Sequence, residues 1–165
     1  MPALTRPLFT PAGGYAEVVA QQFAQALKIP LAGGESIVLI TCLGPAPAVV
    51  ALCVPAATTR VTATAGSNRL AVESATHITV SQIVLGPGVP PGTQVTSISG
   101  TTINLSQPVT APLGTALVFI PTVTNSTGVA VAPGTFLPLG VGSNTYISFI
   151  SHSGQPSILN IATGS

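Results

Sequence analysis

VPPGTQVTSISGTTINLS, residues 89–106, contains eighteen residues and not one charged side chain. Gly92 and Gly100 interrupt it, and Thr, Val, Ile, Leu and Ser fill the segments between and after them. β-Branched residues favour strands, and glycine adopts the positive φ that a tight turn between two strands needs. The stretch therefore predicts two short strands joined at Gly100.

The same pattern occurs again elsewhere in the chain. VTATAGSNRLAVES, from Val61, aligns with VTSISGTTINLSQP, from Val95, and each has a glycine five residues after its first valine. A second pattern occurs three times, as PPGTQV from Pro90, PLGTAL from Pro112 and APGTFL from Ala132. Proline fixes one turn dihedral, glycine permits the next, and threonine begins a strand. Short strands separated by such turns are typical of an all-β sandwich or barrel.

The first 34 residues have a different composition. Residues 1–14 hold three prolines and two glycines, which favours an extended arm that needs a surface to lie on. From Tyr15 to Leu27, apolar residues recur at helical spacing and Pro30 follows, so this segment predicts one N-terminal helix. The candidate capsid- or subunit-contact residues on the arm and the helix are Leu4, Arg6, Leu8, Phe9, Tyr15 and Phe23.

The strongest apolar runs lie before and after the repeated hairpins. This order predicts a mainly β chain in which a small β module interrupts a β-sandwich or barrel-like core. The predicted units are residues 1–34 (N-terminal arm and helix), residues 35–57 with 121–165 (β core) and residues 58–120 (inserted β module).

The apolar run over residues 37–57 raises the alternative of a membrane-spanning helix. Pro45 and Pro47 would lie mid-span, where each removes a backbone donor and clashes with the preceding turn. A buried hairpin of residues 37–43 and 48–54 accounts for the same apolar sequence with less strain. We therefore expect no membrane contact.

The two cysteines are expected to remain thiols. Residues 1–20 lack the continuous apolar core of a signal peptide, so a cytoplasm is the default site of synthesis. In the predicted hairpin, Cys53 also faces Val38 rather than Cys42, which leaves the two sulfurs badly placed for a bridge.

Charged residues make up only 4% of the chain, whereas a typical soluble protein has roughly a quarter. The net charge is +1, and no charged residue follows Glu73. Without a basic cluster the chain cannot neutralise phosphates, so no nucleic-acid partner is expected. Monomers rarely expose large apolar patches, and a net charge near zero favours association. We therefore expect part of the surface to be buried between subunits.

Catalysis, metal binding and cofactor binding are not expected either. A hydrolase needs a nucleophile with a base and a carboxylate, or two carboxylates facing one bond. The chain has three glutamates, no aspartate and two histidines, and on a strand Glu73 and His77 would lie about 13 Å apart. Its cysteines and histidines lack the close paired spacing of zinc ligands. No catalytic residue, metal ligand or cofactor site is therefore predicted.

Residues 86–111, GPGVPPGTQVTSISGTTINLSQPVTA, resemble a small β module common in tailed-bacteriophage virion proteins. In that module Gly-x-Pro-x-Gly-Thr-x-Val leads into a Ser/Gly turn and a Thr-x-x-Leu-Ser strand. Residues 143–164 are similar to the last strands of small phage head-decoration or virion β proteins. The resemblance implies a capsid decoration, or cement, protein that is made in the host cytoplasm and carried on the virion. It would bind the major capsid protein from outside, often as a homotrimer, and stabilise the head.

Two other classes of function stay open. A phage tail or adsorption component would contact the host surface through residues 58–120. A carbohydrate-binding β module would need exposed aromatic side chains for stacking, and the chain has only five Phe, two Tyr and no Trp.

Overall fold

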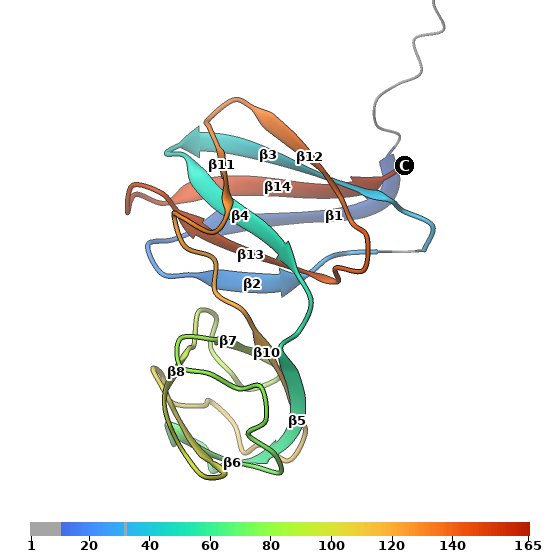
Figure 1. The fold of residues 1–165 in the computed structure, drawn as a ribbon. Coiled ribbons are helices and arrows are strands. Elements are labelled where there is room, and N and C mark those ends of the chain that lie inside the picture. Colours follow the sequence, from blue (N-terminus) through green and yellow to red (C-terminus); the bar gives the residue numbers. More distant parts are fainter. Residues whose placement is uncertain (1–10, 32) are drawn as a thin grey trace, which may run out of the picture.

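The computed structural model describes residues 11–31 and 33–165, with side chains from residue 14 onward. This part of the chain forms β-strands and no helix (Figure 1). The strands pair in three antiparallel sheets. The predicted mainly β class is therefore confirmed, and the predicted N-terminal helix is wrong.

Two of the sheets have four strands each. In spatial order, the first sheet contains β1 (Pro11–Ala20), β14 (Ser157–Gly164), β3 (Ile37–Pro45) and β12 (Phe136–Gly140). The second sheet contains β11 (Val129–Val131), β4 (Ala48–Cys53), β13 (Tyr146–Ser151) and β2 (Gln25–Lys28).

The third sheet has six strands, all from residues 57–120. Its order is β7 (Ile83–Leu85), β10 (Ala116–Ile120), β5 (Ala57–Thr62), β6 (Arg69–Val72), β9 (Thr102–Leu105) and β8 (Val95–Ser99). The division of the chain into three folding units stays a prediction.

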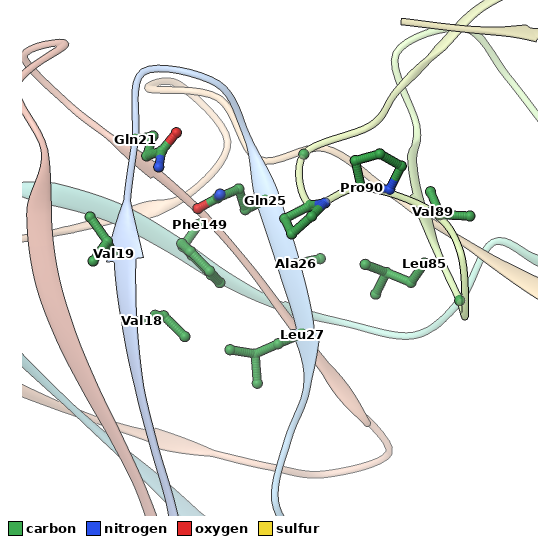
Figure 2. Close-up of a pocket in the computed structure, with 13 residues that line it drawn as sticks. Val18, Val19, Gln21, Gln25, Ala26, Leu27, Leu85, Val89, Pro90 and Phe149 are labelled. Atoms are coloured by element: carbon green, nitrogen blue, oxygen red, sulfur yellow. The ribbon is translucent and has the colours of Figure 1, made fainter. Parts of the chain in front are cut away.

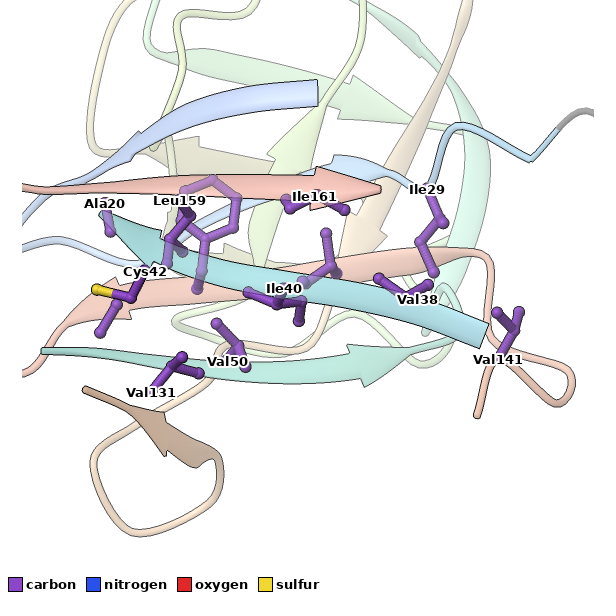
Figure 3. Close-up of a cluster of buried hydrophobic side chains, with 13 residues drawn as sticks. Ala20, Ile29, Val38, Ile40, Cys42, Val50, Val131, Val141, Leu159 and Ile161 are labelled. Carbon is purple, nitrogen blue, oxygen red and sulfur yellow. The ribbon is translucent and has the colours of Figure 1, made fainter. Parts of the chain in front are cut away.

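The first and second sheets share one buried cluster (Figure 3). Val38, Ile40 and Cys42 point into it from β3, while Leu39, Thr41 and Leu43 alternate with them along the strand. Because successive side chains of a strand point to opposite faces, one face of the first sheet is buried and the other faces away from the core. The second sheet contributes Ala48, Val50, Val131, Ile147 and Phe149.

The six-stranded sheet has a buried cluster of its own, in which Leu117 and Phe119 are fully buried. A smaller cluster of Ala24, Ile83 and Ile120 joins this sheet to the second sheet, with Tyr146 and Ile150 packed against it. The six-stranded sheet thus contacts the second sheet, and Figure 1 shows it beyond β2, the last strand of that sheet.

The segment predicted as a helix folds instead as β1, a turn and β2. β1 pairs with β14, which lies about 140 residues further along the chain, so that Val18 faces Leu159. The burial of residues along β1 also has a period of two. Alternating positions are buried or half-buried (Gly14, Ala16, Val18, Ala20) or exposed (Tyr15, Glu17, Val19).

The predicted hairpin of residues 37–43 and 48–54 is also wrong. Its two segments do form strands, but β3 belongs to the first sheet and β4 to the second. They face each other across the core rather than pairing side by side. Cys42 and Cys53 therefore lie in different sheets, and both are free thiols.

Most of the predicted turns are confirmed. β5 pairs with β6 and β8 with β9, and Gly66 and Gly100 between them have φ values of 79° and 59°. In two of the three Pro-Gly-Thr turns, Gly92 and Gly134 have φ values of 74° and 75°. In both turns the next residue is a threonine, whose amide and hydroxyl donate to the carbonyl three residues back.

Gly14 is a position at which β1 tolerates no side chain. An added Cβ would collide with the Pro30 carbonyl oxygen and the Thr163 hydroxyl. Overpacking a buried site costs roughly 1–3 kcal/mol, and a backbone carbonyl cannot rotate away, so we expect Gly14→Ala to lower the free energy of unfolding by about 2–3 kcal/mol. Gly140→Ala is the control, because a Cβ on this β12 glycine would meet no atom within 4 Å. Urea denaturation of both variants measures the difference, and equal stabilities would contradict the packing.

Candidate contact surfaces

The outer face of the first sheet carries a set of apolar side chains, which we call the apolar face. Tyr15 and Phe136 are the most exposed of them, at 61% and 70%. Val19, Leu43 and Ile158 are also exposed, and Leu39 is half-buried. The apolar face comprises Tyr15, Val19, Leu39, Leu43, Phe136, Pro138 and Ile158.

The strand register places these side chains next to one another. Tyr15 pairs with Ala162, Ala162 with Leu39, and Leu39 with Pro138, so one row crosses all four strands. The next row runs from Glu17 through Asn160 and Thr41 to Phe136. The Tyr15 hydroxyl donates to Asn160 Oδ1 at 3.0 Å and so links the two rows.

This face is large and nearly uncharged. Its four strands are about 4.8 Å apart, and an eight-residue strand such as β14 is about 26 Å long, so the face covers roughly 500 Å². The apolar part is smaller than this area, because Glu17, Thr41 and Asn160 lie on the same face. The largest apolar patch on a typical monomer is about 300–600 Å², and such patches are often functional. Glu17 is the single charged residue in residues 14–20, 37–45, 136–140 and 157–164.

A groove of about 450 Å³ is the second candidate surface (Figure 2). β2 lies along it, with Val18 and Val19 of β1 on one side and Val89 and Pro90 of the 86–92 loop on the other. Gln21 and Gln25 supply side-chain amides, and no charged residue lines it. The remaining lining residues are Ala26, Leu27, Leu85, Gly86, Pro91, Gly92 and Phe149.

The structure separates the contact residues predicted from sequence. Tyr15 belongs to the apolar face, whereas Phe23 lies in the turn between β1 and β2 and packs against Gly92 so closely that a Cβ there would collide with its ring. Leu4, Arg6, Leu8 and Phe9 lie outside the described residues. Sequence reasoning missed most of the apolar face, because residues 37–43 are nearly all apolar and show no alternation of polarity.

Near His77, which was considered for catalysis, the hydrogen bonds involve its main chain and Gln82. The carbonyl of His77 accepts a hydrogen bond from Gln82 Nε2 at 3.0 Å, and Gln82 Oε1 accepts one from the Thr79 amide at 3.1 Å. The described residues contain no group of three or more His, Cys, Asp or Glu side chains that could hold a metal ion. Across the same residues, no helix has the length and hydropathy of a membrane span.

Cys53 is half-buried, and this burial raises the pKa of its thiol from 9.0 to about 11. The thiolate is the nucleophile, so a shift of about two pKa units leaves roughly a hundredfold less of it at pH 8. We expect iodoacetamide to alkylate Cys53 roughly a hundredfold more slowly in the folded protein than in guanidinium chloride. Peptide mass spectrometry over a time course measures both rates. Equal rates would contradict the burial.

The same shift has a consequence for stability at high pH. The unfolded thiol ionises near pH 9 and the folded one near pH 11. The contribution of Cys53 is therefore fully present below about pH 9 and is lost as the pH rises to about 11.

Comparisons with protein-family models, with curated proteins and with solved structures found no match. Function is therefore inferred from the contact surfaces and from the sequence.

Proposed function

We propose that the chain is a non-enzymatic virion structural protein of the head-decoration type, which attaches to the outside of a capsid through the apolar face. The observation that carries this proposal is an exposed sheet face of roughly 500 Å² with one charged residue, Glu17. The resemblance of residues 86–111 to a phage virion module supports the same assignment.

The size of the face suits a contact that is repeated many times. At about 25 cal/mol per Å², burying the face contributes at most about 12 kcal/mol, because the polar residues Glu17, Thr41 and Asn160 occupy part of its roughly 500 Å². Association costs an estimated 4–15 kcal/mol, so one such contact would be weak by itself. On a capsid lattice, linked copies bind more tightly than single ones because each further contact is intramolecular.

The fold suits attachment through this face. In this proposal the two four-stranded sheets form a β-sandwich, and residues 58–120 form an inserted module beyond its β2 edge. With the apolar face against the major capsid protein, the six-stranded sheet would lie outside the four-stranded sheet that makes the contact (Figure 1). The homotrimer that the resemblance implies would place three apolar faces on one capsid site.

Binding to particles tests the proposal. The purified protein should bind assembled capsids of its phage saturably and bind free capsid subunits little, and particles lacking it should lose resistance to heat and internal pressure. Particles that keep full resistance without the protein would remove the stabilising role. Binding to tails or host cells instead would support a tail or adsorption component, and binding on a glycan array would support a carbohydrate-binding module.

A further inference from the structure

β2 forms an open sheet edge along the groove. On one side it pairs with β13, and in the described part of the chain no strand pairs with its other side. An edge strand carries unpaired N–H and C=O groups, which makes it a template for an added strand. Figure 2 shows β2 between β1 and the 86–92 loop, so an added segment would have apolar walls on both sides.

The groove selects for an extended, apolar and uncharged ligand. In strand addition, main-chain hydrogen bonds provide affinity and pockets for alternate side chains provide specificity. The walls here are Val18, Leu27, Leu85 and Val89, and the polar groups are the neutral amides of Gln21 and Gln25. A charged ligand would lose hydration in this groove without gaining an ion pair.

We propose that the groove binds residues 1–10 of a second copy of this chain. The segment MPALTRPLFT carries four large apolar side chains, Met1, Leu4, Leu8 and Phe9, and a single charged side chain, Arg6. Pro7 suits an outermost strand if its missing N–H points away from β2. Main-chain N–H groups alternate in direction along a strand, so Pro2, five residues away, then lies outside the segment that pairs with the four-residue β2.

The position of β1 favours a second copy over the same copy. The segment joins β1 at Pro11, which pairs with Gly164, whereas the groove begins at Val18, which pairs with Leu159. On β14 the partners Gly164 and Leu159 are five residues apart, about 17 Å, because the pairing of β1 has a register shift between Pro11 and Tyr15. Ten extended residues reach about 34 Å at most, so a chain's own segment would bring only its first few residues to the groove. Leu8 and Phe9 would stop short of it, whereas the segment of a second copy has no such restriction.

Mixed disulfide crosslinking tests this exchange. Leu8→Cys in one preparation and Gln25→Cys in another are mixed and mildly oxidised, and the product is identified by mass spectrometry. Native Cys42 is buried and Cys53 has a raised pKa, so we expect both to contribute little to the disulfide products. We expect at least tenfold more 8–25 crosslink than with the control Thr101→Cys, an exposed position in the β8–β9 turn.

Two results of the crosslinking would overturn the proposal. One is an equal yield with Thr101→Cys. The other is an intrachain bond without dimers in the Leu8→Cys/Gln25→Cys double variant, which would make the chain's own segment the occupant.

A deletion of residues 1–10 provides a second measurement on the purified protein, because it leaves β1 whole. We expect the mass in solution to fall to that of one chain, with the circular dichroism spectrum unchanged. The synthetic peptide MPALTRPLFT should bind the deleted protein, and its Leu8→Asp form should bind at least tenfold more weakly. An unchanged oligomer after the deletion, or equal binding of the two peptides, would contradict the exchange. These measurements use no capsid, so failure of capsid attachment leaves their outcome unaffected.

Discussion

Replacing Phe119 by alanine is expected to lower the free energy of unfolding by about 3–5 kcal/mol. Phe119 lies on β10, is fully buried, and is the largest buried side chain in the cluster of the six-stranded sheet. β10 pairs with a strand on each side, and Phe119 pairs with Ala57 on β5 and with Val84 on β7. The backbone around the lost ring is therefore fixed by hydrogen bonds, and the cavity cannot easily collapse.

The matched control is Phe136→Ala, the same chemical change at a side chain that is 70% exposed. A surface substitution of this kind changes stability by no more than about 0.5 kcal/mol. Urea denaturation of the two variants, followed by circular dichroism, gives both values. If Phe119→Ala is no less stable than Phe136→Ala, the six-stranded sheet does not have the core described above.

The same variant also tests the proposed inserted module. If residues 58–120 form their own folding unit, Phe119→Ala should shift one of two unfolding transitions and Ile161→Ala, in the shared core of the four-stranded sheets, should shift the other. A single transition that both variants shift would make the chain one cooperative unit.

Turns were the feature of this fold that sequence reasoning predicted best. Gly66 and Gly100 adopt positive φ because few residues other than glycine do so without strain, and this preference is local. The signal at Gly92 and Gly134 is equally local, since the following threonine bonds to a carbonyl three residues away. Gly114 is the exception, because it lacks a positive φ and the preceding Leu113 forms a β-bridge with Ala63 in place of the predicted turn.

Which strands pair in which sheet depends on contacts between residues far apart in the sequence, and a local pattern does not indicate these contacts. Residues 15–27 have apolar spacing compatible with a helix, but pairing with β14 buries Ala16 and Val18 as alternating positions of a strand. The apolar run over residues 37–54 has no alternation of polarity. Its sequence therefore cannot show whether its two strands pair in one sheet or lie in two sheets that face each other across a core. These two incorrect predictions are the reason that the apolar face is not predicted from the sequence: Tyr15 falls in the predicted helix and Leu43 in the predicted buried hairpin.

A carboxylate on the apolar face should weaken capsid attachment strongly. Phe136→Asp removes the most exposed apolar side chain of the first sheet and introduces a charge that loses its water when the face is buried. An unpaired charge in a closed interface costs several kcal/mol. We expect the dissociation constant for assembled capsids to rise at least roughly a hundredfold, which corresponds to about 2.7 kcal/mol.

The control for this variant is Val80→Asp. Val80 is 54% exposed in the loop before β7 of the six-stranded sheet, away from the proposed contact. It adds the same charge to the protein, so any general effect of net charge on attachment appears in both variants. Co-sedimentation of each variant with capsids, over a concentration series, gives the dissociation constants. If Phe136→Asp saturates capsids at the same concentration as the unmodified protein, the apolar face does not contact the capsid, and attachment must use another surface. Weakening by Val80→Asp alone would point to the six-stranded sheet as that surface.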